Sequence, residues 1–538
     1  MGLKEPDLRK LERKLIVSFI ILGIIVIIGI IILIKNTKDK NLPADQSGTK
    51  TSQNQGLDDV TVLIPDNIKL YDQIPEFTYT NEKGEVRSIN DFKGKKVIVT
   101  FWASWCPDCH QQMPLYNQCK ELVDKYDNVE YILINKLDHA KETKEKAKQY
   151  LKDNKIKDAT YYDDGLIAYK LLGMHNIPTT IFIDENGKVT ACYPKQFTDV
   201  SVFEAYLLNT VEGSGTVTKD FVVHQMMDEN GGIHSKFNLN HDITNESDIL
   251  SESQGAVLEY AALNQDKELF DKTLGFIDTY MRAEGLTSWC IAQKKASKTN
   301  ALIDDFRIYK AIYNANKQWG GYDSELARYE EDFKKYAISG GKYVDFYDGS
   351  NDSVAGRFTL CYADFESMSI LKSKDDEFKN AYDKAVNIVN NGMISDEFPL
   401  YYSWYNYDKN RYEEDDLNMS EAMITLLHLA KADMLSEKTI NWLKEQMSKE
   451  GIKARYSVKG EVVKGYNFGS TATYAILAMI ADEIGDNDLR AAALEKMEIM
   501  RINNTDYVYN GAFGEEAGTG ILSFDQLMPI LAYEYKKK

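Results

Sequence analysis

An apolar run lies near the start of the chain, and apolar and polar positions alternate over the rest of its length. Residues 15–34, LIVSFIILGIIVIIGIIILI, carry no charge, and a helix of this length crosses about 30 Å of hydrocarbon. The run is longer than the apolar core of an ordinary signal peptide, and no small-x-small cleavage pattern follows it before Lys35. We therefore expect an uncleaved transmembrane helix, with a cleaved signal peptide as the alternative.

Basic residues around this run predict its orientation. Five precede it and three follow it: Lys4, Arg9, Lys10, Arg13 and Lys14, then Lys35, Lys38 and Lys40. Because Lys and Arg are enriched on the cytoplasmic side, we expect residues 1–14 in the cytoplasm of a bacterium and the bulk of the chain outside the plasma membrane. Residues 35–64 are polar with few large apolar side chains, which predicts a flexible linker.

Residues 65–211 alternate the patterns of strands and helices. Two apolar runs, 95–102 and 129–135, have the length of buried strands, and helical periods follow each of them. Residues 179–194 have the pattern of a hairpin that turns at Asn186 and Gly187. This order predicts an α/β domain with a central sheet.

The character of the sequence changes after residues 212–220, EGSGTVTKD, which we interpret as a second linker. Residues 221–538 show one helical period after another and almost no strand alternation. Such a series predicts an all-α domain, either an α/α toroid or a helical solenoid. A solenoid would show a fixed period, whereas this chain inserts long aromatic loops, which favours the toroid.

Charge and cysteine content narrow the function classes. The 83 acidic and 64 basic residues give a net charge of -19, which would repel a polyanion, so nucleic acid is excluded as a partner. Six cysteines are too few for a disulfide framework in 538 residues. Cys119 and Cys192 are candidates for a bridge, although buried free thiols are the commoner arrangement.

Cys106 and Cys109 form the one cysteine pair with a chemical spacing. Cys106 lies where a strand gives way to a helix, so the helix N-terminus favours its thiolate, and Cys109 follows within reach to resolve a mixed disulfide. A half zinc site is the alternative, but no second CxxC or CxxH follows, so we expect no metal and no cofactor. An X-Pro bond at Ile177 and Pro178 is a candidate cis peptide that would present the Ile177 backbone to an incoming peptide.

The segments FWASWCPDC and IPTTIFID, with Pro114 in the helix between them, resemble the membrane-anchored thioredoxin-like proteins of the TlpA/ResA type. The resemblance covers residues 65–211. It implies that Cys106 is the nucleophile, Cys109 the resolving thiol and Pro178 a cis-proline. It also implies protein thiols and disulfides as partners outside the membrane, with a membrane electron donor as a further candidate. Several such reductases carry a glutamate where this chain has Gln112.

Asp108, between the two cysteines, has two interpretations. Its charge disfavours a neighbouring thiolate, which would make the reduced protein a reductant. Alternatively, it only complements the helix dipole from the first turn. His110 is expected to be an exposed helix residue.

Glu252 is the first candidate for chemistry in the helical part. Ser251 with Gln254 has the pattern of a capping box, in which Glu252 merely occupies the first turn. The segment SESQ, however, resembles the SEGQ segment of glycoside hydrolase family 8, bacterial endoglucanases and related enzymes with an (α/α)6 barrel. That resemblance implies that Glu252 is a general acid. It extends in divergent form over residues 221–538.

Two further acidic segments follow in the order of that family. In the first, Ile303 replaces one of two sugar-contacting aspartates, Asp305 matches the other, and Asp304 is an extra acid with a salt bridge to Arg307 as its alternative role. Asp305 shares a helix face with Tyr309 and Ile312, which favours an inward orientation.

In the second segment, Asp416 matches the base that activates water, with Asp415 as the alternative match. The family usually has an arginine where this chain has Met419. Asp416 could equally cap the N-terminus of the helix that follows. Trp404 and Tyr405, in an aromatic loop, are our candidates for stacking on sugar rings, against core packing as the alternative.

Together these segments predict a thioredoxin-like α/β domain followed by an (α/α)6 domain behind a transmembrane helix. The expected function is thiol–disulfide exchange joined to inverting, two-carboxylate hydrolysis of a β-linked polysaccharide. The departures at Ile303 and Met419 leave a catalytically inactive, glycan-binding barrel as the alternative, and a purely structural scaffold as the third interpretation.

Overall fold

The computed structural model describes residues 64–538 apart from 159, 238, 240–247, 283–284 and 536–538. The predicted cytoplasmic segment 1–14, the transmembrane helix 15–34 and all but the last residue of the linker 35–64 lie outside the described residues. Within the part of the chain that is described, no helix has the length and apolar character needed to span a membrane.

A seven-stranded mixed sheet forms the centre of the first domain, in the order β2-β1-β5-β4-β3-β6-β7. Its strands are β1 (Thr78–Thr80), β2 (Val86–Ser88), β3 (Lys96–Trp102), β4 (Val129–Leu137), β5 (Thr160–Asp164), β6 (Thr179–Ile183) and β7 (Val189–Tyr193). Strands β3, β4 and β5 are parallel, and β6 runs antiparallel to β3. Strand β3 is buried from Val97 to Trp102, which explains its almost continuous apolar sequence. The predicted hairpin is confirmed, with Gly187 at a φ of 82° in the turn between β6 and β7.

Helices flank this sheet: α2 (Pro107–Gln112), α3 (Tyr116–Val123), α4 (Lys144–Asp153), α5 (Ile167–Leu171) and α6 (Val200–Leu208), with 3-10 turns η2 (Ile89–Phe92) and η3 (Met113–Leu115). Helix α6 covers an aromatic cluster in which Phe203 lies against Tyr131 and Phe182. The α/β arrangement predicted for residues 65–211 is therefore present.

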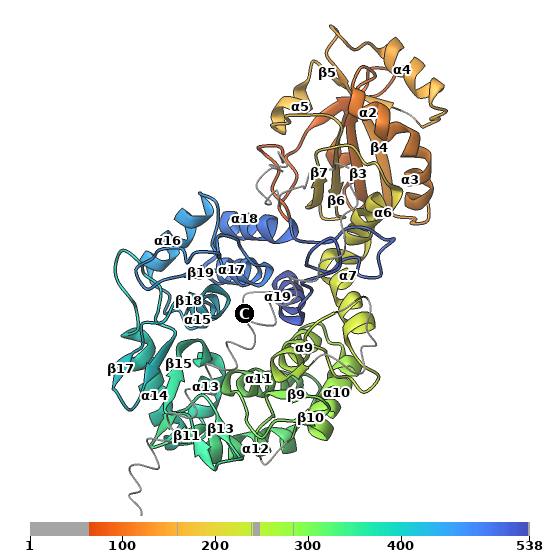
Figure 1. Cartoon of the computed structure of the whole chain (residues 1–538). Helices are drawn as coiled ribbons and strands as arrows, with labels where there is room; N and C mark the ends of the chain where they lie inside the picture. Colours follow the sequence, from red (N-terminus) through yellow and green to blue (C-terminus); the bar gives the residue numbers. More distant parts are fainter. Residues whose placement is uncertain (1–63, 159, 238, 240–247, 283–284, 536–538) are drawn as a thin grey trace, which may run out of the picture. The chain divides into compact units, whose positions relative to one another are not determined.

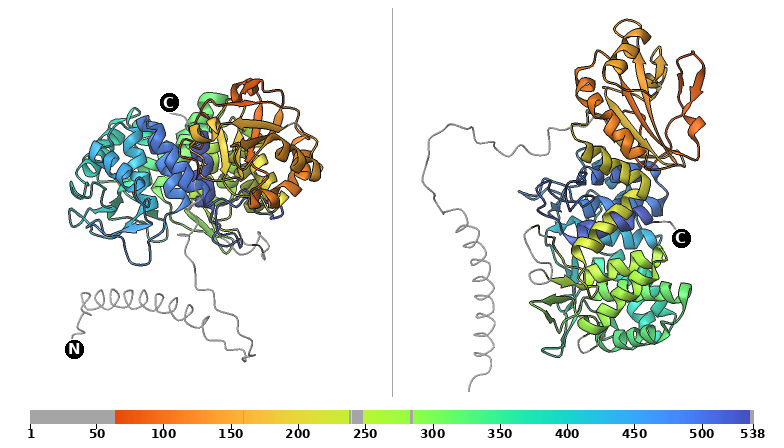
Figure 2. Two further views of the ribbon diagram at one scale, coloured as in Figure 1. Left: turned by 90° about the horizontal axis from the view of Figure 1, so that it is seen from above. Right: turned by 90° about the vertical axis from the view of Figure 1, so that its right-hand side faces the viewer.

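Residues 212–220, predicted as a linker, are helical instead. Helix α6 ends in the π-helical turn η4 (Asn209–Gly213), and after a break at Gly213, whose φ is 93°, the chain forms α7 (Ser214–Phe221) and η5 (Val222–Met226). These elements are drawn in yellow in Figures 1 and 2. The small residues that suggested a linker allow close packing: a Cβ on Gly215 would lie 3.2 Å from the Cβ of Tyr533. Their composition therefore reflects a helix contact.

Helices dominate the second domain and alternate between an inner and an outer set. The inner helices are α9 (Ser251–Leu263), α11 (Leu302–Trp319), α13 (Phe365–Lys372), α15 (Met419–Lys431), α17 (Thr471–Ile484) and α19 (Ser523–Glu534). With α7, the outer helices are α10 (Lys267–Phe276), α12 (Asp323–Asp332), α14 (Asp376–Asn390), α16 (Glu437–Met447) and α18 (Asn487–Glu498). Each inner helix packs against the next, and α19 returns to α9, so the ring closes. The toroid is confirmed.

Short strands and turns occupy the loops of the ring. The strands are β8 (Ile249–Leu250), β9 (Cys290–Ala292), β10 (Lys295–Ala296), β11 (Ile338–Ser339), β12 (Lys342–Tyr343), β13 (Tyr347–Asp348), β14 (Ser353–Val354), β15 (Arg357–Thr359), β16 (Trp404–Asn406), β17 (Arg411–Tyr412), β18 (Leu417–Asn418) and β19 (Arg455–Tyr456). The turns are η6 (Ile277–Met281), η7 (Phe333–Ala337) and η8 (Leu360–Tyr362).

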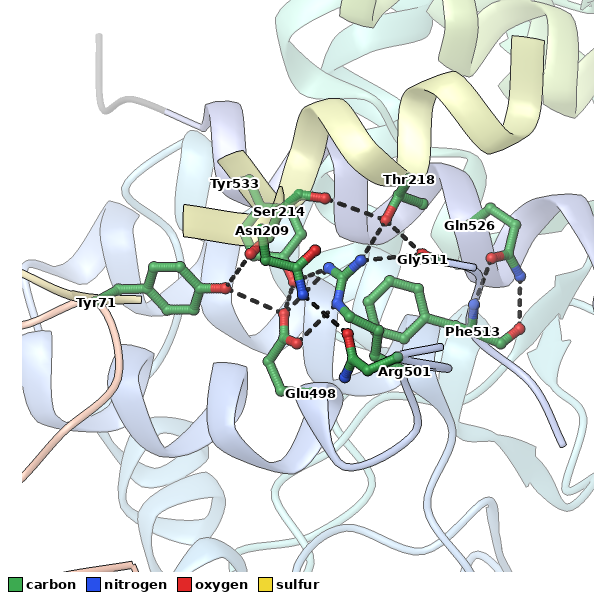
Figure 3. Close-up of polar contacts among 11 residues, drawn as sticks. Tyr71, Asn209, Ser214, Thr218, Glu498, Arg501, Gly511, Phe513, Gln526 and Tyr533 are labelled. Atoms are coloured by element: carbon green, nitrogen blue, oxygen red, sulfur yellow. Dashed lines mark hydrogen bonds and ion pairs between the residues drawn. The ribbon is translucent and has the colours of Figure 1, made fainter. Parts of the chain in front are cut away.

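A buried ion pair lies where the first residues of the α/β domain contact the helical domain (Figure 3). Arg501 donates through Nε to Glu498 Oε2 at 2.8 Å and through Nη1 to Thr218 Oγ1 at 2.7 Å. The Tyr71 hydroxyl lies 3.1 Å from Glu498 Oε1 and 2.9 Å from Ser214 Oγ. Residues from three distant parts of the sequence therefore supply the hydrogen bonds of one buried guanidinium and its carboxylate.

Candidate functional sites

Cys106 is the N-cap residue of α2, and its sulfur is held by two backbone groups. The Cys109 N–H donates to Cys106 Sγ at 3.3 Å, and Cys106 Sγ lies 3.3 Å from the Ile177 carbonyl oxygen, its acceptor. The Ile177–Pro178 peptide is cis. The structure thus brings together the four residues Cys106, Cys109, Ile177 and Pro178 that the sequence singled out.

The two thiols differ in acidity. The hydrogen bond with Cys109 is the largest influence on Cys106 and lowers its pKa to about 7, against burial and the charge of Asp108, which both raise it. The same interaction, together with burial, raises the pKa of Cys109. Near neutral pH, Cys106 is therefore partly thiolate and Cys109 stays protonated. Cys119 and Cys192 are free and buried.

Glu142 is a neighbour of the thiol site that the sequence did not single out. Its side chain is fully buried and accepts from the Ser104 backbone N–H at 2.6 Å and from Ser104 Oγ at 3.0 Å. Ser104 lies two residues before Cys106, and its carbonyl oxygen is 2.6 Å from Nε2 of the exposed His110. Glu142 therefore fixes the loop that leads into α2. No periodicity or spacing marks it, because it belongs to a polar loop after β4.

Gln112 has a structural contact of its own. It is buried, and its Oε1 accepts from the Phe197 backbone N–H at 3.0 Å. The amide therefore fixes the segment after β7 rather than standing free beside the cysteines.

In the helical domain, hydroxyl and carboxylate contacts connect the first turns of neighbouring inner helices. Ser251 of α9 donates to Asp304 of α11 at 2.5 Å, and Ser253 of α9 lies 2.8 Å from Ser523 of α19. The ring continues from Asp525 of α19 to the Ala472 N–H of α17 at 3.0 Å, and from Ser470, which caps α17, to Ser420 of α15 at 3.4 Å. These contacts place the N-termini of five inner helices at one end of the barrel.

Glu252 lies in this ring of N-termini, between Ser251 and Ser253. Burial raises its pKa to about 7, helped by the charges of Asp304, Asp525 and Glu421 and opposed by that of Arg307. The predicted capping box is wrong: Leu250 is the N-cap residue, and Ser251 bonds to Asp304 instead of capping α9. Glu252 nevertheless lies in the first turn of α9, as the alternative interpretation of this segment expected.

Asp304 and Asp305 both have hydrogen-bond partners that the sequence did not predict. Asp305 is fully buried and accepts from the Thr287 N–H at 2.9 Å and from Asn300 Nδ2 at 2.7 Å. Both of its oxygens are thus used inside the protein, which argues against the predicted sugar contact. Asp304 bonds to Ser251 and faces Glu252, while Arg307 pairs with Glu259 at 3.7 Å.

Asp415 and Asp416 lie just before strand β18 and helix α15, so they are not part of the ring of N-termini. Both are exposed, and Asp415 accepts from Trp404 Nε1 at 2.7 Å. Asp416 does not cap α15, since the N-cap residue is Asn418. The sequence missed Glu421, a carboxylate in the first turn of α15 whose charge raises the pKa of Glu252. The sequence does contain a signal for Glu421, because an acidic residue lies at the same position of the first turn in two inner helices, Glu421 in α15 and Asp525 in α19.

Trp404 and Tyr405 lie on strand β16, where successive side chains point to opposite faces. Trp404 lies under the Arg357 guanidinium at 5.2 Å. Tyr405 packs against Tyr407 and Tyr412. Only one of the two can therefore face the ring of N-termini, and the contact with Arg357 favours Trp404. Trp289 is a further aromatic there, 45% exposed, whose carbonyl accepts from the Ser251 N–H.

Comparisons with known proteins find similar proteins for both domains. Residues 69–207 match the family model for Redoxin. The thiol-disulfide oxidoreductase ResA of Bacillus thuringiensis subsp. konkukian (strain 97-27) is 35% identical over 119 residues, which cover 22% of this chain and 65% of ResA. YdaJ of Bacillus subtilis (strain 168), whose name describes a lipoprotein, is 27% identical over 322 residues, 58% of this chain and 84% of YdaJ.

Among solved structures, an alpha-amylase from Clostridium perfringens is 30% identical, with a TM-score of 0.56, and the match covers 60% of this chain and 97% of that chain. The chain therefore joins an α/β domain similar to ResA to a helical domain similar to this alpha-amylase. More particularly, residues 69–207 form a Redoxin domain.

Proposed function

We propose that this chain is a membrane-anchored, extracytoplasmic protein that exchanges disulfides with protein partners and cleaves a polysaccharide by an inverting mechanism. The apolar run 15–34 and the lipoprotein name of the relative YdaJ support the anchor. The observation that carries the redox activity is the unequal acidity of Cys106 and Cys109. The observation that carries the hydrolytic activity is the half-buried Glu252 among three other carboxylates.

In the redox reaction, the Cys106 thiolate attacks one sulfur of a partner disulfide and expels the other as a thiolate. Cys109 then loses its proton and attacks Cys106 Sγ, which releases the second partner thiol and leaves a Cys106–Cys109 disulfide. The Ile177 carbonyl, 3.3 Å from Cys106 Sγ, lies where a partner peptide would pass. A membrane electron donor would then restore the dithiol.

In the hydrolytic reaction, Glu252 donates its proton to the glycosidic oxygen as the bond to the anomeric carbon breaks. A general acid must be protonated at working pH, and burial supplies this condition although a helix N-terminus favours the anion. A second carboxylate takes a proton from the attacking water. Asp416 is the residue that the family resemblance assigns to this role.

The substrate class has two candidates. The resemblance to glycoside hydrolase family 8 favours a β-linked polysaccharide of the cell surface or an exopolysaccharide. The likeness to an alpha-amylase from Clostridium perfringens favours an α-glucan. Reducing-end release by the full-length chain should therefore be measured on carboxymethyl-cellulose, lichenan, xylan, chitosan and amylose.

The Glu252→Gln variant should lose this release by a factor of about 100 to 10,000, since proton donation contributes that much. Glu437→Gln is a matched control, because Glu437 also lies in the first turn of a helix, the outer helix α16. Binding without release in the wild type would favour the inactive, glycan-binding barrel that the changes at Ile303 and Met419 suggest. A wild type that neither binds nor cleaves any of these polymers would favour the purely structural scaffold.

A further inference from the structure

Four carboxylates gather at the end of the barrel where the inner helices begin. Glu252 of α9, Asp304 of α11, Glu421 of α15 and Asp525 of α19 all lie in the first turns of their helices. The contacts between Ser251 and Asp304, Ser253 and Ser523, Asp525 and Ala472, and Ser470 and Ser420 hold these turns side by side.

Two of these carboxylates already have protein partners for an oxygen. Asp304 accepts from Ser251, and Asp525 accepts from the Ala472 backbone N–H. Among the described residues, the Glu421 carboxylate has one hydrogen bond, which Asn418 Nδ2 donates to its Oε1 at 3.3 Å, and Glu421 is exposed. Glu421 is therefore the carboxylate of this group with the most freedom to contact water.

Two arginines stand near Glu421. Asn418 and Arg455 are paired across strands β18 and β19, immediately before Glu421, and Arg357 lies between Asp345 and the Trp404 ring. Both arginine charges lower the pKa of Glu421, and burial, the larger effect, raises it. A solvent-accessible carboxylate with two arginine charges nearby can stay ionised until it accepts a proton from water.

Asp416 lacks this setting. It lies before strand β18 and outside helix α15, so it is not in the first turn of an inner helix as Glu252 and Glu421 are. Its neighbour Asp415 is bonded to Trp404. Glu421, in contrast, influences the pKa of Glu252 and that of Cys361, which precedes α13 in the turn η8.

We propose that Glu421, rather than Asp416, is the general base of the hydrolytic reaction. The assignment rests on the glycosidase activity proposed above. Glu421 removes a proton from water while the water oxygen bonds to the anomeric carbon. The bond from that carbon to the glycosidic oxygen breaks, and this oxygen takes the proton of Glu252. Each turnover thus leaves Glu421 protonated and Glu252 ionised, and proton exchange with solvent restores both.

The test compares Glu421→Ala and Asp416→Ala in the full-length chain, on the polymer that the wild type cleaves best. Glu421→Ala should lower kcat by about 100 to 10,000-fold with little change in KM, and Asp416→Ala should stay within about threefold of the wild type. Sodium azide should restore turnover of Glu421→Ala and yield a glycosyl azide of inverted configuration, since the anion needs no base. The near-isosteric Glu421→Gln and thermal melts of every variant check folding.

Three results would overturn the assignment. An active Glu421→Ala would show that another group takes the proton, and Asp416 would be that group if its variant is inactive and rescued by azide. If Glu421→Ala melts at the wild-type temperature but loses turnover that azide does not restore, Glu421 would be a positioning residue instead of the base. A wild type that releases no reducing ends from any polymer would overturn the glycosidase itself, and the assignment with it.

Discussion

Cys106 and Glu252 both lie at the start of a helix, yet their pKa values move in opposite directions. The sulfur of Cys106 receives the Cys109 N–H and interacts with the Cys109 thiol, and both effects favour the thiolate. Glu252 has the same favourable dipole but is half-buried, and its desolvation and the charges of Asp304, Asp525 and Glu421 favour the protonated acid. The dipole effect, about 0.3–1 kcal/mol, is thus smaller than the effects of local neighbours.

Cys106 should react with iodoacetamide at a rate that rises through about pH 7. Its pKa of about 7 makes the thiolate fraction increase there, while burial raises the pKa of Cys119 to about 12. Asp108→Asn should shift this midpoint to lower pH, because the charge of Asp108 raises the pKa of Cys106. Glu121→Gln, on the exposed face of α3, is the control and should leave the midpoint unchanged. An unchanged midpoint in Asp108→Asn would assign Asp108 to the helix dipole alone.

Glu252→Gln should stabilise the fold at pH 8 but not at pH 4. The folded-state pKa of about 7 exceeds the ordinary carboxyl value, so the folded chain binds the proton more tightly than the unfolded chain. Stability therefore falls as pH rises from about 4.5 to 7, by at most about 3 kcal/mol. Chemical denaturation of wild type and variant at both pH values measures the difference. Equal stabilisation at pH 4 and pH 8 would point to packing instead.

At the scale of elements, a buried charge network crosses the inner helices below the ring of N-termini. Lys310 of α11 lies 3.1 Å from Asp364, the N-cap of α13, and 3.1 Å from Glu366. These two carboxylates raise the pKa of Lys310 although burial lowers it. The network fixes where α13 begins, because Asp364 also accepts from the Glu366 and Ser367 N–H groups.

Lys310→Met should destabilise the helical domain by about 3–5 kcal/mol, since it leaves buried Asp364 without its counter-charge. Adding Asp364→Asn to this variant should recover part of the loss, because the uncompensated charge is then gone. Lys449→Met is the matched control: Lys449 pairs with Glu445 at 2.6 Å, but both side chains are 59% exposed, so the cost should stay under about 1 kcal/mol. A double variant less stable than Lys310→Met would contradict the charge argument.

At the scale of the whole molecule, the α/β domain and the helical domain share hydrogen bonds around Arg501 (Figure 3). Tyr71 from the first residues of the one meets Glu498 at the end of α18 in the other. Asn209, in the helix that connects them, donates to Asn503 at 2.9 Å. The two domains should therefore unfold as coupled units rather than independently.

Tyr71→Phe should lower the stability of the helical domain by about 1–2 kcal/mol, because Glu498 loses a hydrogen-bond donor. Tyr162→Phe is the control, since the buried Tyr162 hydroxyl of the α/β domain has no partner among the described residues, and its removal should cost nothing. Differential scanning calorimetry on the full-length chain measures both. An unchanged helical transition in Tyr71→Phe would mean that the domains unfold independently.

The sequence by itself determined the elements whose signals are local. Strand β3, the cysteine spacing at α2 and the hairpin at Gly187 follow from short apolar runs and turn residues, whose physics involves neighbours in the chain. The succession of helical periods predicted a closed helical domain in the same way. The candidate residues Cys106, Cys109 and Glu252 came from such short segments.

Only the tertiary structure decided contacts between residues far apart in the chain. It made most of the predicted linker 212–220 part of helix α7, in which Gly215 lies close to Tyr533. It bonded Ser251 to Asp304, so that Ser251 does not cap α9. It also buried Asp305, which accepts a hydrogen bond from Asn300. It also brought Glu421 near enough to the half-buried Glu252 for its charge to raise the pKa of Glu252. Burial and charge depend on which helices meet, and no local pattern contains that information.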